Sequence, residues 1–242
     1  MSAVINAIKI IFLLGFLVFI HESGHFCVAK LCKVRVNEFA IGFGPTIWSK
    51  KGKVTKYALR VIPLGGFVSM EGEDEPSEKE GSFSKASVWK RILIVAAGAT
   101  VNIIFAIIVF WCLSTYYVGP LNALYNVGYY LQTMWQGIVQ LFTGKVGIDQ
   151  MTGPVGISSA VAQTSTVADF IYLLSVISLS LGVTNLLPFP PLDGGKIVLL
   201  IIEWIRKKPL DEKYEVGIQM IGFGLMIMLS IYVTYHDILR II

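Results

Sequence analysis

The sequence predicts an α-helical membrane protein, because its composition is strongly apolar and four long apolar segments recur along it. Of the 242 residues, 55% are hydrophobic and only 15% are charged. A soluble domain has about 25% charged residues, so this chain has too few polar groups to cover a surface in water. We expect about four transmembrane helices, a small membrane-associated β-hairpin or sheet, and an interfacial amphipathic helix.

Four segments approach the roughly 20 apolar residues that about 30 Å of hydrocarbon requires. They cover about residues 5–29, 92–113, 170–187 and 216–233. No small-residue cleavage site follows the first segment, so we expect a retained helix rather than a removed signal peptide. We interpret residues 1–242 as one domain built on these spans.

The distribution of basic residues predicts the orientation of the spans. Lysine and arginine are abundant in residues 30–91 and recur in residues 205–214, whereas Lys145 is alone in the loop after the second span. Cytoplasmic loops carry the excess of basic residues. The segment 30–91 and the segment 205–214 are therefore expected in the cytoplasm, with both chain ends on the opposite side.

The segment after the first span is expected to form strands. Residues 55–61 alternate with a period of two, which is the pattern of a β-strand. A turn at Lys51-Gly52 can fold this strand back on residues 34–48 as a hairpin or small sheet. We expect the strand to end at residues 63–66, which hold a proline and two glycines.

An amphipathic helix is predicted between the second and third spans. Apolar residues recur every three or four positions from Leu121 to Phe142, with asparagine and glutamine on the opposite face. This pattern is typical of a helix that lies on a membrane surface. Gly128 and Gly137 disfavour one continuous helix.

Chemistry is concentrated near the end of the first span, where residues 21–25 read HESGH, an HExxH pattern. Residues four apart share a helix face, so His21 and His25 can direct both imidazoles at one metal ion. Glu22 can act as a general base toward water that a zinc ion activates. Helix packing alone explains these three polar residues poorly. The free energy of inserting a charged group at the centre of a membrane helix is unfavourable by about 2.5–3.5 kcal/mol even on the lenient insertion scale.

A catalytic zinc site takes three protein ligands and leaves one position open. Asp193 is the candidate for the third ligand, because it follows the third span on the side where the first span ends. Prolines at 188, 190 and 191 prevent a regular helix there, and irregular backbone at membrane depth lines a wet cavity or is buried in protein. The alternative role of Asp193 is to cap a helix expected over residues 194–204.

These motifs together resemble the site-2 protease family of intramembrane zinc metalloproteases, in its bacterial regulator of sigma-E protease type. The likeness rests on HExxH in the first span and on NLLPFPPLDG at residues 185–194. Residues 42–45, 63–67, 153–156 and 208–210 are also similar to stretches of that family. The resemblance implies that His21, His25 and Asp193 are zinc ligands. It also implies that Glu22 is the catalytic base and that Asn185 contacts the substrate.

The resemblance also implies a mode of substrate binding. Gly65, Gly66 and Phe67 lie in a stretch similar to a membrane-associated hairpin that pairs with an unwound substrate segment. A peptide bond in a helix is shielded, so the target must unwind, and an edge strand can bind its freed backbone groups. Such proteases usually carry PDZ domains between the second and third spans. Because the segment 114–169 is short, we expect none here.

We therefore expect a zinc-dependent intramembrane endopeptidase in a bacterial cytoplasmic (inner) membrane, with its active site near the cytoplasmic side. Its expected partners are membrane lipid and the transmembrane helices of single-span proteins, by resemblance anti-sigma factors or remnant signal peptides. The net charge of +4 gives no indication of nucleic-acid binding.

Two alternatives differ in class. A metal transporter is disfavoured because the sequence shows no inverted repeat. A catalytically silent or gated zinc-binding membrane scaffold would not require Glu22 as a base.

Overall fold

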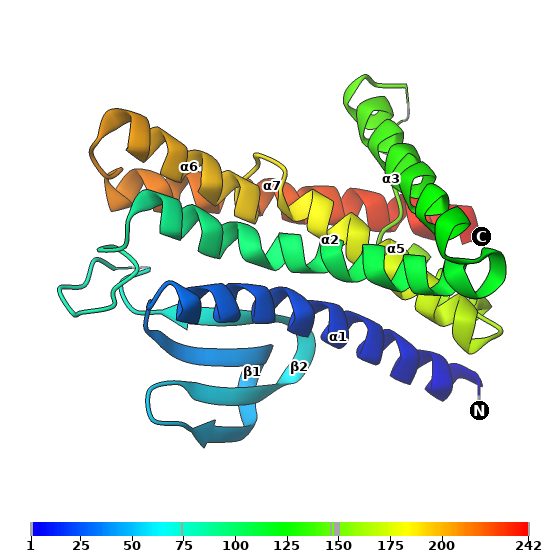
Figure 1. Cartoon of the computed structure of the whole chain (residues 1–242), viewed down its shortest axis with the longest axis horizontal. Coiled ribbons are helices and arrows are strands. Elements are labelled where there is room, and N and C mark those ends of the chain that lie inside the picture. The colour runs from blue at the N-terminus through cyan, green and yellow to red at the C-terminus, as the bar shows by residue number, and fades with distance from the viewer. Residues whose placement is uncertain (1, 74, 146, 148–150, 242) are drawn as a thin grey trace. The chain divides into compact units, whose positions relative to one another are not determined.

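A computed structural model describes residues 2–73, 75–145, 147 and 151–241. In chain order its elements are α1 (Ser2–Leu31), β1 (Val36–Lys51), β2 (Lys56–Met70), α2 (Val88–Val118), α3 (Pro120–Phe142), α4 (Pro154–Gln163), α5 (Val167–Asn185), α6 (Asp193–Arg206) and α7 (Glu212–Ile241) (Figure 1).

Four of the helices are long and apolar enough to cross a membrane. Their candidate spans are Ala3–Leu31, Val88–Val118, Val167–Asn185 and Lys213–Arg240. They coincide with the four predicted segments, which confirms the fold class of a mostly helical membrane protein with a small antiparallel sheet. Most of the helix ends extend beyond the predicted bounds, since hydropathy locates the apolar centre of a span while the hydrogen-bonded helix continues into more polar residues.

The predicted amphipathic helix between the second and third spans is α3, and it is continuous through Gly128 and Gly137. Two glycines cost about 1 kcal/mol each in a helix, which an amphipathic segment of this length can offset. The helix begins with Pro120 in its first turn. Proline lacks an N–H group, and this is tolerated there because N–H groups of the first turn have no acceptor within the helix. Its location on a membrane surface stays a prediction.

Strands β1 and β2 pair antiparallel in one small sheet. The expected turn is present, and Gly52 N donates to Thr55 O at 2.8 Å. The expected end of the strand at residues 63–66 is wrong, because β2 continues to Met70 and its residues 66–69 pair with residues 38–41 of β1. Gly65 makes this possible by adopting φ +115°, a conformation that side chains disfavour.

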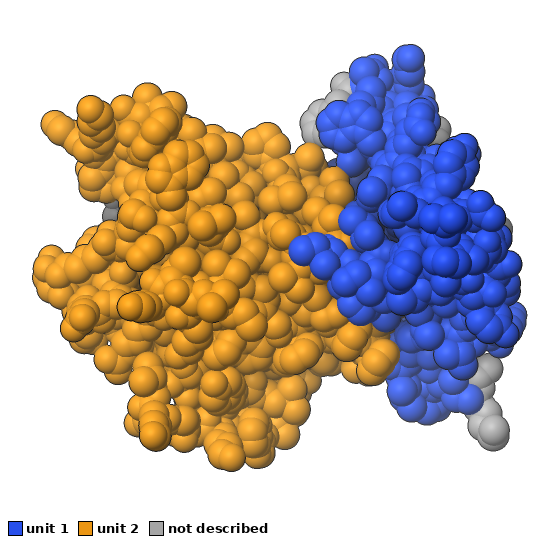
Figure 2. Space-filling model, viewed as in Figure 1, with its two compact units in different colours: residues 1–10, 104–180, 223–242 blue, residues 11–103, 181–222 orange. Residues whose placement is uncertain are grey.

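The chain divides into two compact units (Figure 2). One unit, here called the sheet unit, comprises residues 11–103 and 181–222. The other comprises residues 1–10, 104–180 and 223–242. All the candidate site residues named from the sequence belong to the sheet unit.

The core of the sheet unit joins the sheet to α1, α2 and α6. Its buried apolar residues are Ala29, Val34, Val36, Phe39, Val68, Met70, Phe83, Ile94, Val95 and Leu200. An ion pair adds to this packing, because Arg91 Nη1 donates to Glu203 Oε2 at 2.9 Å and Nη2 donates to the second carboxylate oxygen. This bidentate pair ties α6 to the start of α2.

In the other unit, Asp237 of α7 holds the start of α4. Its Oδ2 atom accepts hydrogen bonds from the backbone N–H groups of Gly153 and Gly156 at 2.9 and 2.8 Å. A carboxylate at a helix N-terminus is favourable because the free N–H groups there carry partial positive charge.

Candidate active site

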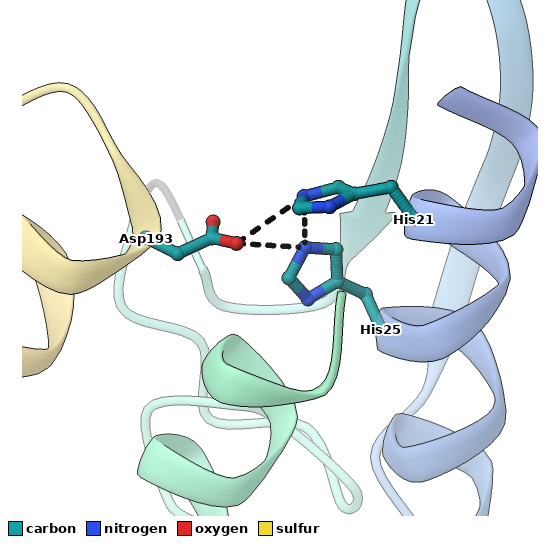
Figure 3. A group of neighbouring side chains, drawn as sticks. All are labelled: His21, His25 and Asp193. Carbon is teal, nitrogen blue, oxygen red and sulfur yellow. Dashed lines mark hydrogen bonds and ion pairs between the residues drawn. The ribbon is translucent and has the colours of Figure 1, made fainter. Parts of the chain in front are cut away.

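The two histidines of the HExxH pattern lie one turn apart on α1 and face the same direction (Figure 3). Their Nε2 atoms are 3.2 Å from each other, and the His21 side chain is buried. The helix is regular through residues 21–25, so the sequence spacing alone brings these imidazoles together.

Asp193 is the first residue of α6 and points its carboxylate at both imidazoles (Figure 3). Its Oδ2 atom lies 3.2 Å from His21 Nε2 and 3.5 Å from His25 Nε2. The N-cap position of α6 belongs to Leu192, so Asp193 does not cap the helix from that position. Residues 186–192 are not helical, in agreement with their prolines.

The three donor atoms fit a zinc ion. Ligands about 2 Å from a tetrahedral ion are about 3.3 Å from one another, close to the 3.2–3.5 Å observed between these atoms. Asp193 Oδ2 is buried and accepts no hydrogen bond within the described part of the chain. A buried carboxylate oxygen without a donor is costly, and a cation at the centre of the group would offset that cost.

Helix α2 contacts the two imidazoles at their Nδ1 atoms, whereas their Nε2 atoms face Asp193. His25 Nδ1 lies 2.8 Å from the backbone oxygen of Ile94, and Asn102 Nδ2 lies 3.3 Å from His21 Nδ1. Gly98 lies between them, where an added Cβ would lie 2.8 Å from His21 Nε2 and closer still to His25.

The sequence did not assign a role to these three α2 residues. Asn102 had a visible signal, since it is a polar residue inside an apolar span. The sequence gives no signal for the contact of the Ile94 carbonyl with His25 or for the close approach of the imidazoles to Gly98, because both contacts depend on where α1 packs against α2.

Glu22 lies beside the ligand group without belonging to it. Its carboxylate interacts electrostatically with His25 and Asp193. Strand β2 passes next to it, since a Cβ added to Gly66 would lie 3.1 Å from Glu22 Cγ. The candidate base is therefore next to both the metal-ligand group and strand β2.

The remaining predicted residues have different surroundings. Gly66 and Phe67 pair with Ile41 and Ala40 of β1, and Gly65 precedes them in the same strand. Asn185 is the last residue of α5 and donates from Nδ2 to Leu181 O at 3.0 Å. The structure thus brings β2 to Glu22 but gives the Asn185 amide a partner in its own helix.

Known proteins similar to this chain include a family and several bacterial relatives. The family model described as Peptidase family M50 matches residues 9–229. A Clostridium acetobutylicum protein named "Putative zinc metalloprotease" is 27% identical, with 96% of this chain and 97% of that protein covered. A Clostridium perfringens protein of the same description is 30% identical, with 92% and 95% covered. A Vibrio cholerae protein of that description is 48% identical over 111 residues, or 44% of this chain.

These similarities extend over nearly the whole chain and include the HExxH segment and Asp193. The alignment with the Clostridium acetobutylicum protein runs over 330 positions, so that relative has insertions that this chain lacks. Together with the four apolar helices and the His-His-Asp group, the matches show that the chain belongs to Peptidase family M50, the site-2 proteases, as a multi-pass membrane zinc metalloprotease.

Proposed function

We propose that this protein hydrolyses peptide bonds in transmembrane segments of other membrane proteins, in regulated intramembrane proteolysis. The observation that carries this proposal is the position of His21, Glu22 and His25 within a helix long enough to span a bilayer, with the Asp193 carboxylate of α6 facing both imidazoles. His21 precedes the predicted end of the first span at residue 29 by about 12 Å at about 1.5 Å per residue of α1. A hydrocarbon layer about 30 Å thick that ends there would enclose His21 in its cytoplasmic half.

His21 and His25 would hold the zinc ion through Nε2, and Asp193 through Oδ2. When bound, zinc supplies a Lewis acid that polarises a peptide carbonyl and activates water. Glu22 takes a proton from the water oxygen as this oxygen bonds to the carbonyl carbon. Glu22 then gives the proton to the amide nitrogen as the C–N bond breaks. The carboxylate can serve both transfers because it lies outside the ligand group.

Strand β2 is the proposed binding site for the substrate backbone. Among the described residues, 66–70 pair with β1 on one side, and this edge runs beside Glu22 at Gly66. A substrate helix must unwind before cleavage, and each unpaired backbone group costs several kcal/mol in hydrocarbon. An edge strand at Gly65, Gly66 and Phe67 would bind those groups. Asn185, on release from Leu181 O, would orient the substrate or stabilise its oxyanion.

The proposed location is a bacterial cytoplasmic membrane, with the site near the cytoplasmic side. The basic residues of segment 30–91 support this orientation, and the relatives described above are bacterial. The proposed substrates are single-span proteins such as anti-sigma factors or remnant signal peptides. Lipid would contact the exposed apolar faces of the four candidate spans.

The test is cleavage of a synthetic single-span substrate by the purified protein in detergent, with zinc content measured in parallel. Glu22→Gln should lower cleavage by at least about 100-fold, because it removes the general base, and should retain zinc. The matched control is Glu78→Gln, which changes a carboxylate that is 98% exposed and should leave cleavage intact.

Chelation of zinc should also abolish cleavage. Equal cleavage by the Glu22→Gln and wild-type proteins would contradict the proposal. Stoichiometric zinc in a wild-type protein that cleaves none of several substrates would favour the membrane scaffold.

A further inference from the structure

Asn102 is a fully buried polar residue of α2, 0% exposed, and its amide faces His21. It belongs to a stripe of residues spaced by four, which share one face of the helix. On this stripe, the backbone oxygen of Ile94 contacts His25, and the amide of Asn102 contacts His21. Gly98, which lies between them, leaves room for both imidazole rings. One face of α2 therefore contacts both imidazoles of the ligand group.

The proton positions on the imidazoles follow from these neighbours. A neutral imidazole binds a metal through its unprotonated nitrogen, while the other nitrogen carries hydrogen. A backbone carbonyl only accepts, so His25 Nδ1 donates to Ile94 O at 2.8 Å, and His25 Nε2 is left with a lone pair. That atom is the one that faces Asp193.

The same requirement applies to His21, whose Nε2 also faces Asp193. Its Nδ1 must then carry hydrogen and needs an acceptor. Asn102 can supply one, because a half turn of its amide places Oδ1 where Nδ2 lies and moves no other atom of the residue appreciably. The 3.3 Å separation from His21 Nδ1 is within hydrogen-bonding reach.

We propose that Asn102 is a positioning residue of the zinc site, whose side-chain oxygen accepts a hydrogen bond from His21 Nδ1–H in the metal-loaded protein. This bond fixes the ring orientation and directs Nε2 at the ion. The proposal rests on the ligand set of the proposed function. Partners of this kind typically contribute about 10–100-fold to metal affinity.

The first experiment compares zinc affinities, measured by competition with a chromophoric chelator. Asn102→Leu keeps the size of the side chain but removes the acceptor, and should weaken zinc binding by about 10–100-fold. Asn102→Asp keeps an oxygen at the same position and should bind more tightly than Asn102→Leu. The matched control is Ser175→Ala, since Ser175 is equally buried but donates to Tyr172 O on α5.

A second readout separates positioning from general support of the fold. In the Co²⁺-loaded protein, the ligand imidazoles should give two exchangeable, paramagnetically shifted N–H signals in NMR spectra. Asn102→Leu should selectively speed exchange of the His21 signal, while the His25 signal stays protected by Ile94 O. Loss of protection at both histidines would indicate a structural role and overturn the proposal.

Unchanged zinc affinity with two protected signals in Asn102→Leu would also overturn it. Should Asn102→Leu fail to fold, Asn102→Ala provides the same comparison, with folding checked by thermal unfolding of the zinc-free protein. The zinc affinity of the His21→Ala protein, measured in the same way, tests the proposed ligand set itself. If its affinity equals that of the wild type, the proposed ligand set is wrong, and the role of Asn102 falls with it.

Discussion

At the scale of single residues, the candidate site depends on a glycine next to the imidazoles as much as on the metal-ligating residues. Gly98 lies where both imidazoles approach α2, and an added Cβ would lie 2.8 Å from His21 Nε2. That separation is shorter than ordinary van der Waals contact. Any larger residue must therefore displace the imidazoles, because the α2 backbone at Gly98 is fixed within a regular helix.

We expect Gly98→Ala to lower kcat/KM for a single-span substrate by about 100-fold, the effect of misplacing reactive groups by about 1 Å. Zinc content should fall as well. The matched control is Gly15→Ala on α1, where an added Cβ meets no atom within 4 Å. That change should leave cleavage intact and stabilise the helix by about 0.5–1 kcal/mol. Wild-type cleavage in Gly98→Ala would refute this account.

At the scale of elements, three helices and one strand supply the site. Helix α1 carries the two histidines and the candidate base Glu22, and α6 carries Asp193 at its first residue. The Arg91–Glu203 ion pair ties α6 to α2, which contacts the imidazoles. Strand β2 adds an edge beside Glu22, because it continues through Gly65 rather than ending there.

The proposed role of β2 in substrate binding predicts where a substrate can be captured. A photo-crosslinking residue at Phe67 should trap a single-span substrate on the Glu22→Gln protein, which would bind substrate without releasing products. The same residue at Trp48 is the control, since Trp48 is exposed and pairs with Leu59 in another part of the sheet. Gel-shifted adducts report the capture. Equal capture at both positions, or none at Phe67, would rule out substrate pairing with β2.

At the scale of the whole molecule, the zinc site connects segments that are far apart in the sequence. A ligand that binds only the folded state stabilises it, by about 2.7 kcal/mol when its free concentration is 100 times the Kd. We therefore expect chelation to lower the thermal unfolding midpoint of the wild type in detergent, followed by the fluorescence of its five tryptophans. His21→Ala should show no response to chelation. A wild-type midpoint that does not change with zinc would contradict a site that links these segments.

The sequence by itself determined the fold class, the four apolar helices, the turn at Gly52 and the shared face of His21 and His25. These features are local, because hydropathy and residue spacing act within one segment. It also pointed to Asp193, through the need for a third ligand, but left open whether this residue caps a helix.

Only the tertiary structure decided that Asp193 Oδ2 lies 3.2 Å from His21 Nε2 and that Leu192 holds the N-cap. The tertiary structure also revealed the contacts of Ile94, Gly98 and Asn102 with the imidazoles, and the passage of β2 beside Glu22. These contacts depend on how α1, α2, α6 and the sheet pack around a shared core, and no pattern within one segment records which residues of another will face it.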